Sequence, residues 1–134
     1  MADNQLAFFS KMNEASTLVG VPASTQEERK ALANAVMSPT GKLGDFVNME
    51  ITLKNFYMEK ISMTTEDGEL RDGYRTVLID AAGNSYATSS TGVANSLKTI
   101  ISFFGTPENW GDGLPVIVKQ INTGSTRVYS LQLA

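Results

Sequence analysis

The 134-residue sequence contains no cysteine and no histidine. Without cysteine the chain forms no disulfides and no thiolate metal sites, and without histidine it lacks the most common general base. A Ser-His-Asp triad and a zinc site with nitrogen or sulfur ligands are therefore excluded. Any catalysis would have to use carboxylates, lysine, tyrosine or oxygen-bound Mg²⁺. The composition favours a binding or structural protein, and we expect no catalytic residues, no metal site and no cofactor.

Long apolar runs are also missing. No stretch approaches the roughly 20 apolar residues that a membrane span requires. The N-terminus does not combine a basic segment with a long apolar stretch, so we expect no signal peptide. These features predict a cytoplasmic protein that has no membrane partner.

Charge is modest in amount and acidic in sign. The chain has 11 basic and 14 acidic side chains, a net charge of −3, whereas nucleic-acid-binding domains are usually basic. The acidity is concentrated in Glu27, Glu28 and the stretch 66–72, and residues 81–134 are slightly positive. Because charge of the two signs is separated along the chain, a positive groove remains compatible with the acidic total.

The first 40 residues differ in character from the rest. Ser24 or Thr25 is a typical N-cap, and apolar residues follow it at helical spacing until Ser38-Pro39 ends the pattern. We therefore expect residues 1–40 to form an N-terminal helical arm.

From residue 41 onward the pattern predicts a mainly β domain that extends to residue 134. Alternating residues predict a long strand over 45–64, bent near Asn55, and Asp and Gly predict a turn after it. Further strands are expected at 74–80, 85–89, 114–121 and 126–133, with a helix at 91–104. Five strands with one helix between the third and fourth is the order of a five-stranded OB-fold barrel.

Aromatic side chains occur beside basic ones along several of these strands. Proteins that bind single-stranded DNA without sequence preference combine aromatic rings, on which bases stack, with cations along the phosphates. The candidate nucleic-acid-binding residues are Lys54, Tyr57, Lys60, Arg71, Tyr74, Arg75, Tyr86, Lys119, Arg127 and Tyr129.

Each of these tyrosines is also compatible with a structural role, because tyrosine is enriched in strands by β propensity alone. Phe56, Phe103 and Phe104 are expected to pack in the core or against the helix. Trp110 is expected to cover one end of the barrel, with stacking on a base as the alternative.

Three segments resemble the single-stranded-DNA-binding proteins of protein-primed tailed phages, the small podovirus family. They are the strand Glu50-x-Thr52-x-x-x-x-Tyr57, the hairpin Ala81-x-Gly83-x-x-Tyr86, and the C-terminal hairpin with Val116-x-Val118 and Ser130–Leu133. They occur in the family's order over about three quarters of the chain.

The resemblance implies a protein of the infected host cytoplasm that coats and protects single-stranded DNA during phage DNA replication. It also implies that bases stack on Tyr57 and Tyr86. Residues 1–33 have no clear counterpart in the resemblance, and their apolar residues Leu6, Phe8, Phe9 and Met12 suit self-association. The phage DNA polymerase is a further expected partner. The alternative is a phage protein–protein interaction or structural module on a small β barrel, which the acidic net charge favours.

Overall fold

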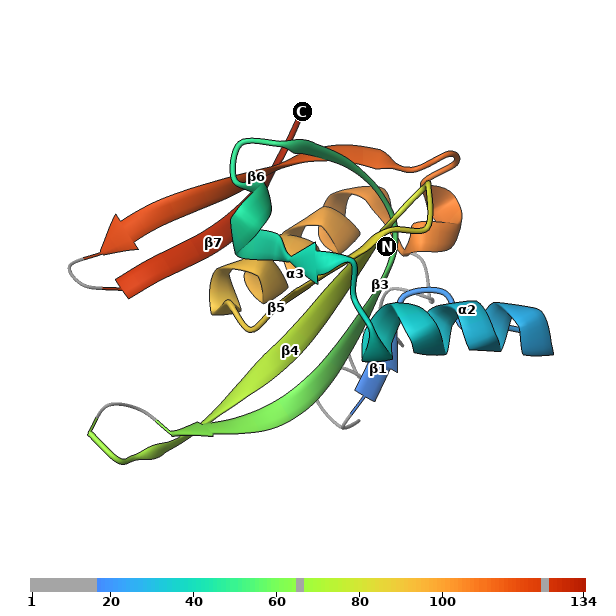
Figure 1. The fold of residues 1–134 in the computed structure, drawn as a ribbon. Coiled ribbons are helices and arrows are strands. Elements are labelled where there is room, and N and C mark those ends of the chain that lie inside the picture. The colour runs from blue at the N-terminus through green and yellow to red at the C-terminus, as the bar shows by residue number, and fades with distance from the viewer. Residues whose placement is uncertain (1–16, 65–66, 124–125) are drawn as a thin grey trace.

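The computed structural model describes residues 17–64, 67–123 and 126–134 (Figure 1). Within these ranges the helices are α2 (Gln26–Met37) and α3 (Thr91–Phe104), and the 3₁₀ turns are η1 (Leu43–Phe46) and η2 (Pro107–Asn109). The strands are β1 (Thr17–Val19), β2 (Gly41–Lys42), β3 (Glu50–Thr64), β4 (Leu70–Asp80), β5 (Ser85–Thr88), β6 (Leu114–Thr123) and β7 (Thr126–Leu133).

All seven strands belong to one curled sheet that forms a half-barrel, with the order β2-β5-β4-β3-β6-β7 and β1 paired to β3. Strand β3 is central because it pairs with β6 through Glu50–Leu53 and with β4 through most of its remaining length. The register between β3 and β4 shifts between Leu53 and Asn55. This irregularity lies where the sequence predicted a bend.

The half-barrel is not closed by strand pairing, because its edge strands β2 and β7 are not neighbours in the sheet. The side chains of Ser90, the N-cap residue of α3, and of Ser96 within the helix instead contact the free edge of β7. The Ser90 hydroxyl donates to the Tyr129 carbonyl at 2.9 Å and accepts from the Tyr129 N–H at 3.1 Å. The Ser96 hydroxyl accepts from the Leu131 N–H at 3.0 Å. This close approach requires Gly92, since a Cβ there would lie 2.2 Å from the Tyr129 carbonyl oxygen.

The main core lies between the sheet and α3. Val93, Leu97 and Ile101 of the helix are fully buried, as the apolar spacing predicted. Gly105 ends the helix with φ of 79°, a conformation that favours glycine.

Trp110 packs at the end of α3. It is 5% exposed, stacks on Phe56 with ring centroids 6.4 Å apart, and donates from Nε1 to the Gly105 carbonyl at 2.9 Å. Phe56 is therefore a core residue, as expected, and Trp110 covers it.

Helix α2 begins at the N-cap Thr25, whose side chain accepts from the Glu28 N–H at 3.1 Å. The Glu28 carboxylate in turn accepts from the Ser24 N–H and hydroxyl. These reciprocal bonds resemble a capping box and fix the start of the helix.

The mainly β class, the barrel and the helix between β5 and β6 agree with the sequence prediction. The predicted number of five strands is wrong, because the sheet also contains the short strands β1 and β2. The predicted turn is shorter than expected, since residues 70–73 belong to β4. The first long strand begins at Glu50 rather than at residue 45, because η1 occupies residues 43–46.

The expected packing of Phe103 and Phe104 is also wrong, because their side chains are 81% and 41% exposed. Both lie at the end of α3, beyond the buried stripe that ends at Ile101.

Residues 17–40 do not form the separate N-terminal helical arm that the sequence predicted. Strand β1 pairs with β3, and the Ser85 hydroxyl donates to the Ala35 carbonyl of α2 at 2.9 Å. The apolar residues Leu6, Phe8, Phe9 and Met12 lie outside the described residues. The domain boundary at residue 40 stays a prediction.

Candidate nucleic-acid interface

The register of β3 and β4 divides the candidate residues between two faces of the sheet. Phe56 lies opposite Leu78, and both are fully buried in the main core. Residues one position along point to the opposite face, because side chains alternate along a strand. Tyr57 opposite Val77 therefore lies on the outer face, and Lys60 opposite Tyr74 lies on the core side.

The outer face carries a small polar network beside Tyr57. The Tyr57 hydroxyl donates to the Glu59 carboxylate at 3.2 Å, and Glu59 pairs with Arg75 at 3.6 Å. Partial burial of the ring, followed by the negative charge and hydrogen bond of Glu59, raises the pKa of Tyr57, and Arg75 opposes this shift. The phenol therefore stays protonated at neutral pH, with its ring half-buried.

Helix α2 covers part of the same face. The Arg75 guanidinium donates to the Val36 carbonyl at 2.8 Å, and Ser85 of β5 binds the neighbouring Ala35 carbonyl. Asn55 fixes the preceding segment, since its side chain accepts from the Val21 N–H at 2.8 Å and donates to the Val21 carbonyl at 3.1 Å. Arg75 thus attaches α2 to the sheet as well as pairing with Glu59.

Tyr86 lies in the core. It is 7% exposed, and its ring packs edge-on against Phe46 with centroids 4.8 Å apart. Its hydroxyl donates to the Asp80 carboxylate at 2.9 Å. Burial and then Asp80 raise the pKa of Tyr86. The ring connects η1 to β5, and this geometry favours a structural role, so stacking of Tyr86 on a base stays a prediction.

Tyr74 and Tyr129 are half-buried and pack against the main core. The Tyr129 hydroxyl lies over η1, where a Cβ on Gly44 would be only 2.7 Å from it. Lys60 shares the face of Tyr74 and is exposed. Lys60 and Tyr74 are separate from Tyr57 and Arg75, because they occupy the opposite face of the β3–β4 hairpin.

The remaining cations are spread over the molecule. Lys54 lies at the register shift of β3 and donates to the Gly111 carbonyl. Lys119 is half-buried on β6 opposite Ser130. The backbones of Arg71 and Arg127 lie near the ends of the two long hairpins, paired with Met63 and Asn122; their side chains are outside the described structure.

The two long hairpins extend toward the same side of the molecule, β3–β4 below and β6–β7 above in Figure 1. In OB-folds the corresponding loops flank the ligand. The structure therefore places Lys60, Tyr74 and Tyr129 on these hairpins, and Tyr57 and Arg75 on the outer face beneath α2.

No residue of α2 was predicted from the sequence to belong to an interface. The helix spacing indicated an apolar side, with Leu32 and Val36 half-buried, but nothing in that spacing showed which surface it covers. Its Arg29 lines a cavity together with Tyr57. The contacts of Arg75 and Asn55 with backbone carbonyls likewise have no sequence signal.

No group of carboxylates suitable for a metal ion occurs within the described ranges. The described helices include none that is long and apolar enough to cross a membrane.

Comparison with known protein families identifies a match over most of the chain. The model of the family described as phage single-stranded DNA-binding protein, of the phi29 type, matches residues 14–134. No curated protein and no solved structure matches the chain. The family match includes every described strand and helix, and the curled β sheet is consistent with an OB-fold. The chain belongs to the phi29-type family of phage single-stranded DNA-binding proteins.

Proposed function

We propose that this protein coats and protects single-stranded DNA during phage DNA replication in the host cytoplasm, without sequence preference and without catalysis. Bases stack on its aromatic side chains, and its cations contact phosphates. The observation that carries this proposal is the family match over residues 14–134, which includes the whole barrel.

Stacking supplies most of the affinity in this proposal. The net charge of −3 limits phosphate contacts, whereas each stacked base contributes roughly 1–3 kcal/mol. Tyr57 is the first candidate for stacking, because its ring is half-buried and borders a cavity. Tyr74 and Tyr129 are the candidates on the two hairpins, with Lys60 beside Tyr74.

Titration of a labelled oligo(dT), followed by fluorescence anisotropy at low salt, tests the proposal. Anisotropy is preferable to tryptophan quenching because Trp110 is buried. We expect saturable binding, with a duplex of the same length bound much more weakly. Equal affinity for the duplex would contradict it, and no binding to either would favour the alternative, a protein–protein interaction module.

Self-association through the N-terminal residues and contact with the phage DNA polymerase remain predictions. Sedimentation of the free chain tests the first, and co-sedimentation with the polymerase tests the second. A monomer at all concentrations, or a polymerase that sediments alone, would contradict the corresponding prediction.

A further inference from the structure

Helix α2 does not lie flush on the outer face of the sheet. None of its residues is fully buried, and two cavities lie beneath it. Leu32, Pro22 and Ala23 line both cavities, so Leu32 projects from the helix between them.

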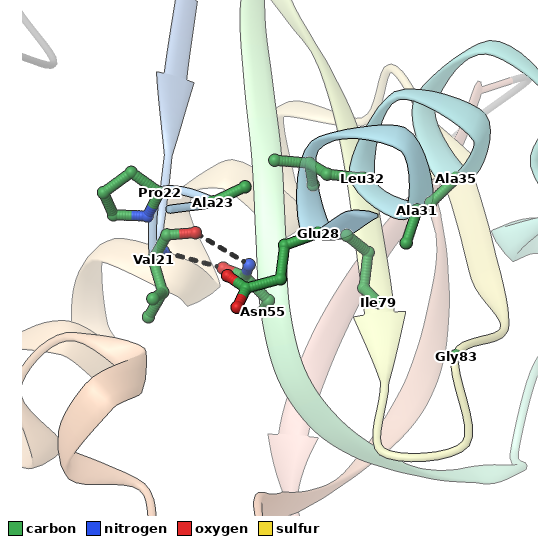
Figure 2. Close-up of a pocket in the computed structure, with 10 residues that line it drawn as sticks. All are labelled: Val21, Pro22, Ala23, Glu28, Ala31, Leu32, Ala35, Asn55, Ile79 and Gly83. Atoms are coloured by element: carbon green, nitrogen blue, oxygen red, sulfur yellow. Dashed lines mark hydrogen bonds between the residues drawn. The ribbon is translucent and has the colours of Figure 1, made fainter. Parts of the chain in front are cut away.

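The first cavity has a volume of about 270 Å³. Figure 2 shows it between α2 and the strands, with Ala31 and Ala35 pointing toward Ile79 and the Glu28 carboxylate near Asn55. A carboxylate at this position repels a phosphate, so the cavity is a poor site for DNA.

The second cavity is lined by a basic side chain in place of the acidic one. It is open to solvent, has a volume of about 390 Å³ and is lined by Tyr57, by the apolar side chains of Val19 and Val36, and by Arg29. Its volume falls at the lower end of the range for small-ligand pockets, which suits a single nucleotide. Met37 lies at its rim with 72% of its surface exposed, an apolar group that a base could cover.

The charges around this cavity leave one cation available. Glu59 is balanced by Arg75, and Arg75 also binds the Val36 carbonyl. Arg29 is exposed and forms no ion pair with any other residue that the structure describes. A ring, apolar walls and an available guanidinium are the groups that recognise an unpaired base and its phosphate.

We propose that the cavity between Tyr57 and α2 is a nucleotide subsite, in which Tyr57 stacks on an unpaired base and Arg29 contacts the adjoining phosphate. This inference rests on the proposed function and extends it, because it makes α2 part of the DNA interface.

Two matched pairs of variants test the subsite by oligo(dT) titration. Arg29→Gln removes the guanidinium, and Lys30→Gln removes a neighbouring exposed charge that lines neither cavity. We expect Arg29→Gln to weaken binding about five- to tenfold and to reduce the log–log salt slope by about 0.7, the value for one phosphate contact on a single strand. We expect Lys30→Gln to stay within about twofold of the unmodified chain, since it loses no direct contact.

The second pair fills the cavities. Ala33→Phe places a ring in the Tyr57 cavity, and Ala31→Phe places one in the cavity of Figure 2. We expect Ala33→Phe to weaken binding about tenfold or more, equivalent to loss of one stacked base, and Ala31→Phe to have little effect. Circular dichroism melts check that the variants fold. If Ala33→Phe does not fold, the comparison of Arg29→Gln with Lys30→Gln, both at exposed positions, decides whether the cavity is a subsite.

If either control weakened binding as much as its partner, the cavity would not be the subsite, although the proposed function would stand. If the unmodified chain did not bind oligo(dT), the proposed function itself would fail. The two failures are therefore distinguishable.

Discussion

Two tyrosines for which the family resemblance implied one role occupy different environments. Tyr57 is half-buried beside a cavity, whereas Tyr86 is 7% exposed and its hydroxyl is bound to Asp80. A stacking platform must present its ring to the base, and a core aromatic cannot do so without rearrangement. We therefore expect substitutions at the two positions to affect different measurements.

Replacement of Tyr86 should affect stability. We expect Tyr86→Ala to lower the free energy of unfolding by about 3–5 kcal/mol, as truncation of buried aromatic residues does. Tyr86→Phe should cost less, because it keeps the ring against Phe46 and loses only the bond to Asp80. Urea denaturation measures both, and an unchanged unfolding curve for Tyr86→Ala would contradict the core placement.

Replacement of Tyr57 should affect binding. We expect Tyr57→Ala to reduce the affinity for oligo(dT) by about 1–3 kcal/mol while the melting temperature changes little. Tyr57→Phe should reduce it much less, because the ring provides the stacking. Anisotropy titrations and thermal melts of the same samples separate the two effects. Binding that is indifferent to Tyr57→Ala would transfer the stacking role to Tyr74 and Tyr129.

At the scale of the elements, β1 and α2 are integrated into the fold. Val77 is fully buried yet lies outside the main core cluster, and its register with Tyr57 places it on the outer face. Helix α2 covers part of this face, and β1 extends the sheet beside it by pairing with β3. The N-terminal segment thus supplies part of the protein's interior.

Deletion of this segment should therefore destabilise the barrel. We expect a chain without residues 1–40 to be at least about 2 kcal/mol less stable than one without residues 1–16, since exposure of a buried valine alone costs about that much. Thermal and urea unfolding of the two chains measures the difference. Equal stability would instead support the independent arm that the sequence suggested.

The positions of the helices and strands in the sequence were largely predictable. Which face of the sheet each side chain occupies was not. Alternation and turn residues located the long strands, and apolar spacing located α3 and its end at Gly105. Continued alternation from Ile51 and Leu53 would place Tyr57 in the core. The register shift around Lys54 reverses this, so that Phe56 and Met58 point inward. No local sequence signal reveals this reversal, or the surface on which α2 packs, because both depend on contacts between distant segments.

For the whole molecule, the acidic net charge constrains how binding responds to salt. If three to five phosphates are neutralised, at about 0.7 per phosphate on a single strand, the log–log slope should be about −2 to −3.5. Titrations between low and moderate salt measure it. A slope steeper than about −6 would reveal a cationic surface that the charge distribution does not suggest.

The contacts of α3 with β7 also bear on how the protein behaves when many copies are crowded together. An open strand edge offers its N–H and C=O groups to the edges of other molecules, and this is a common route to aggregation. Here Ser90 and Ser96 occupy three such groups, on Tyr129 and Leu131. The two hydroxyls take the place of a neighbouring strand, but they belong to a helix and its N-cap residue, which cannot extend a sheet. These contacts therefore leave fewer groups on the β7 edge to recruit other copies into a continuous β structure.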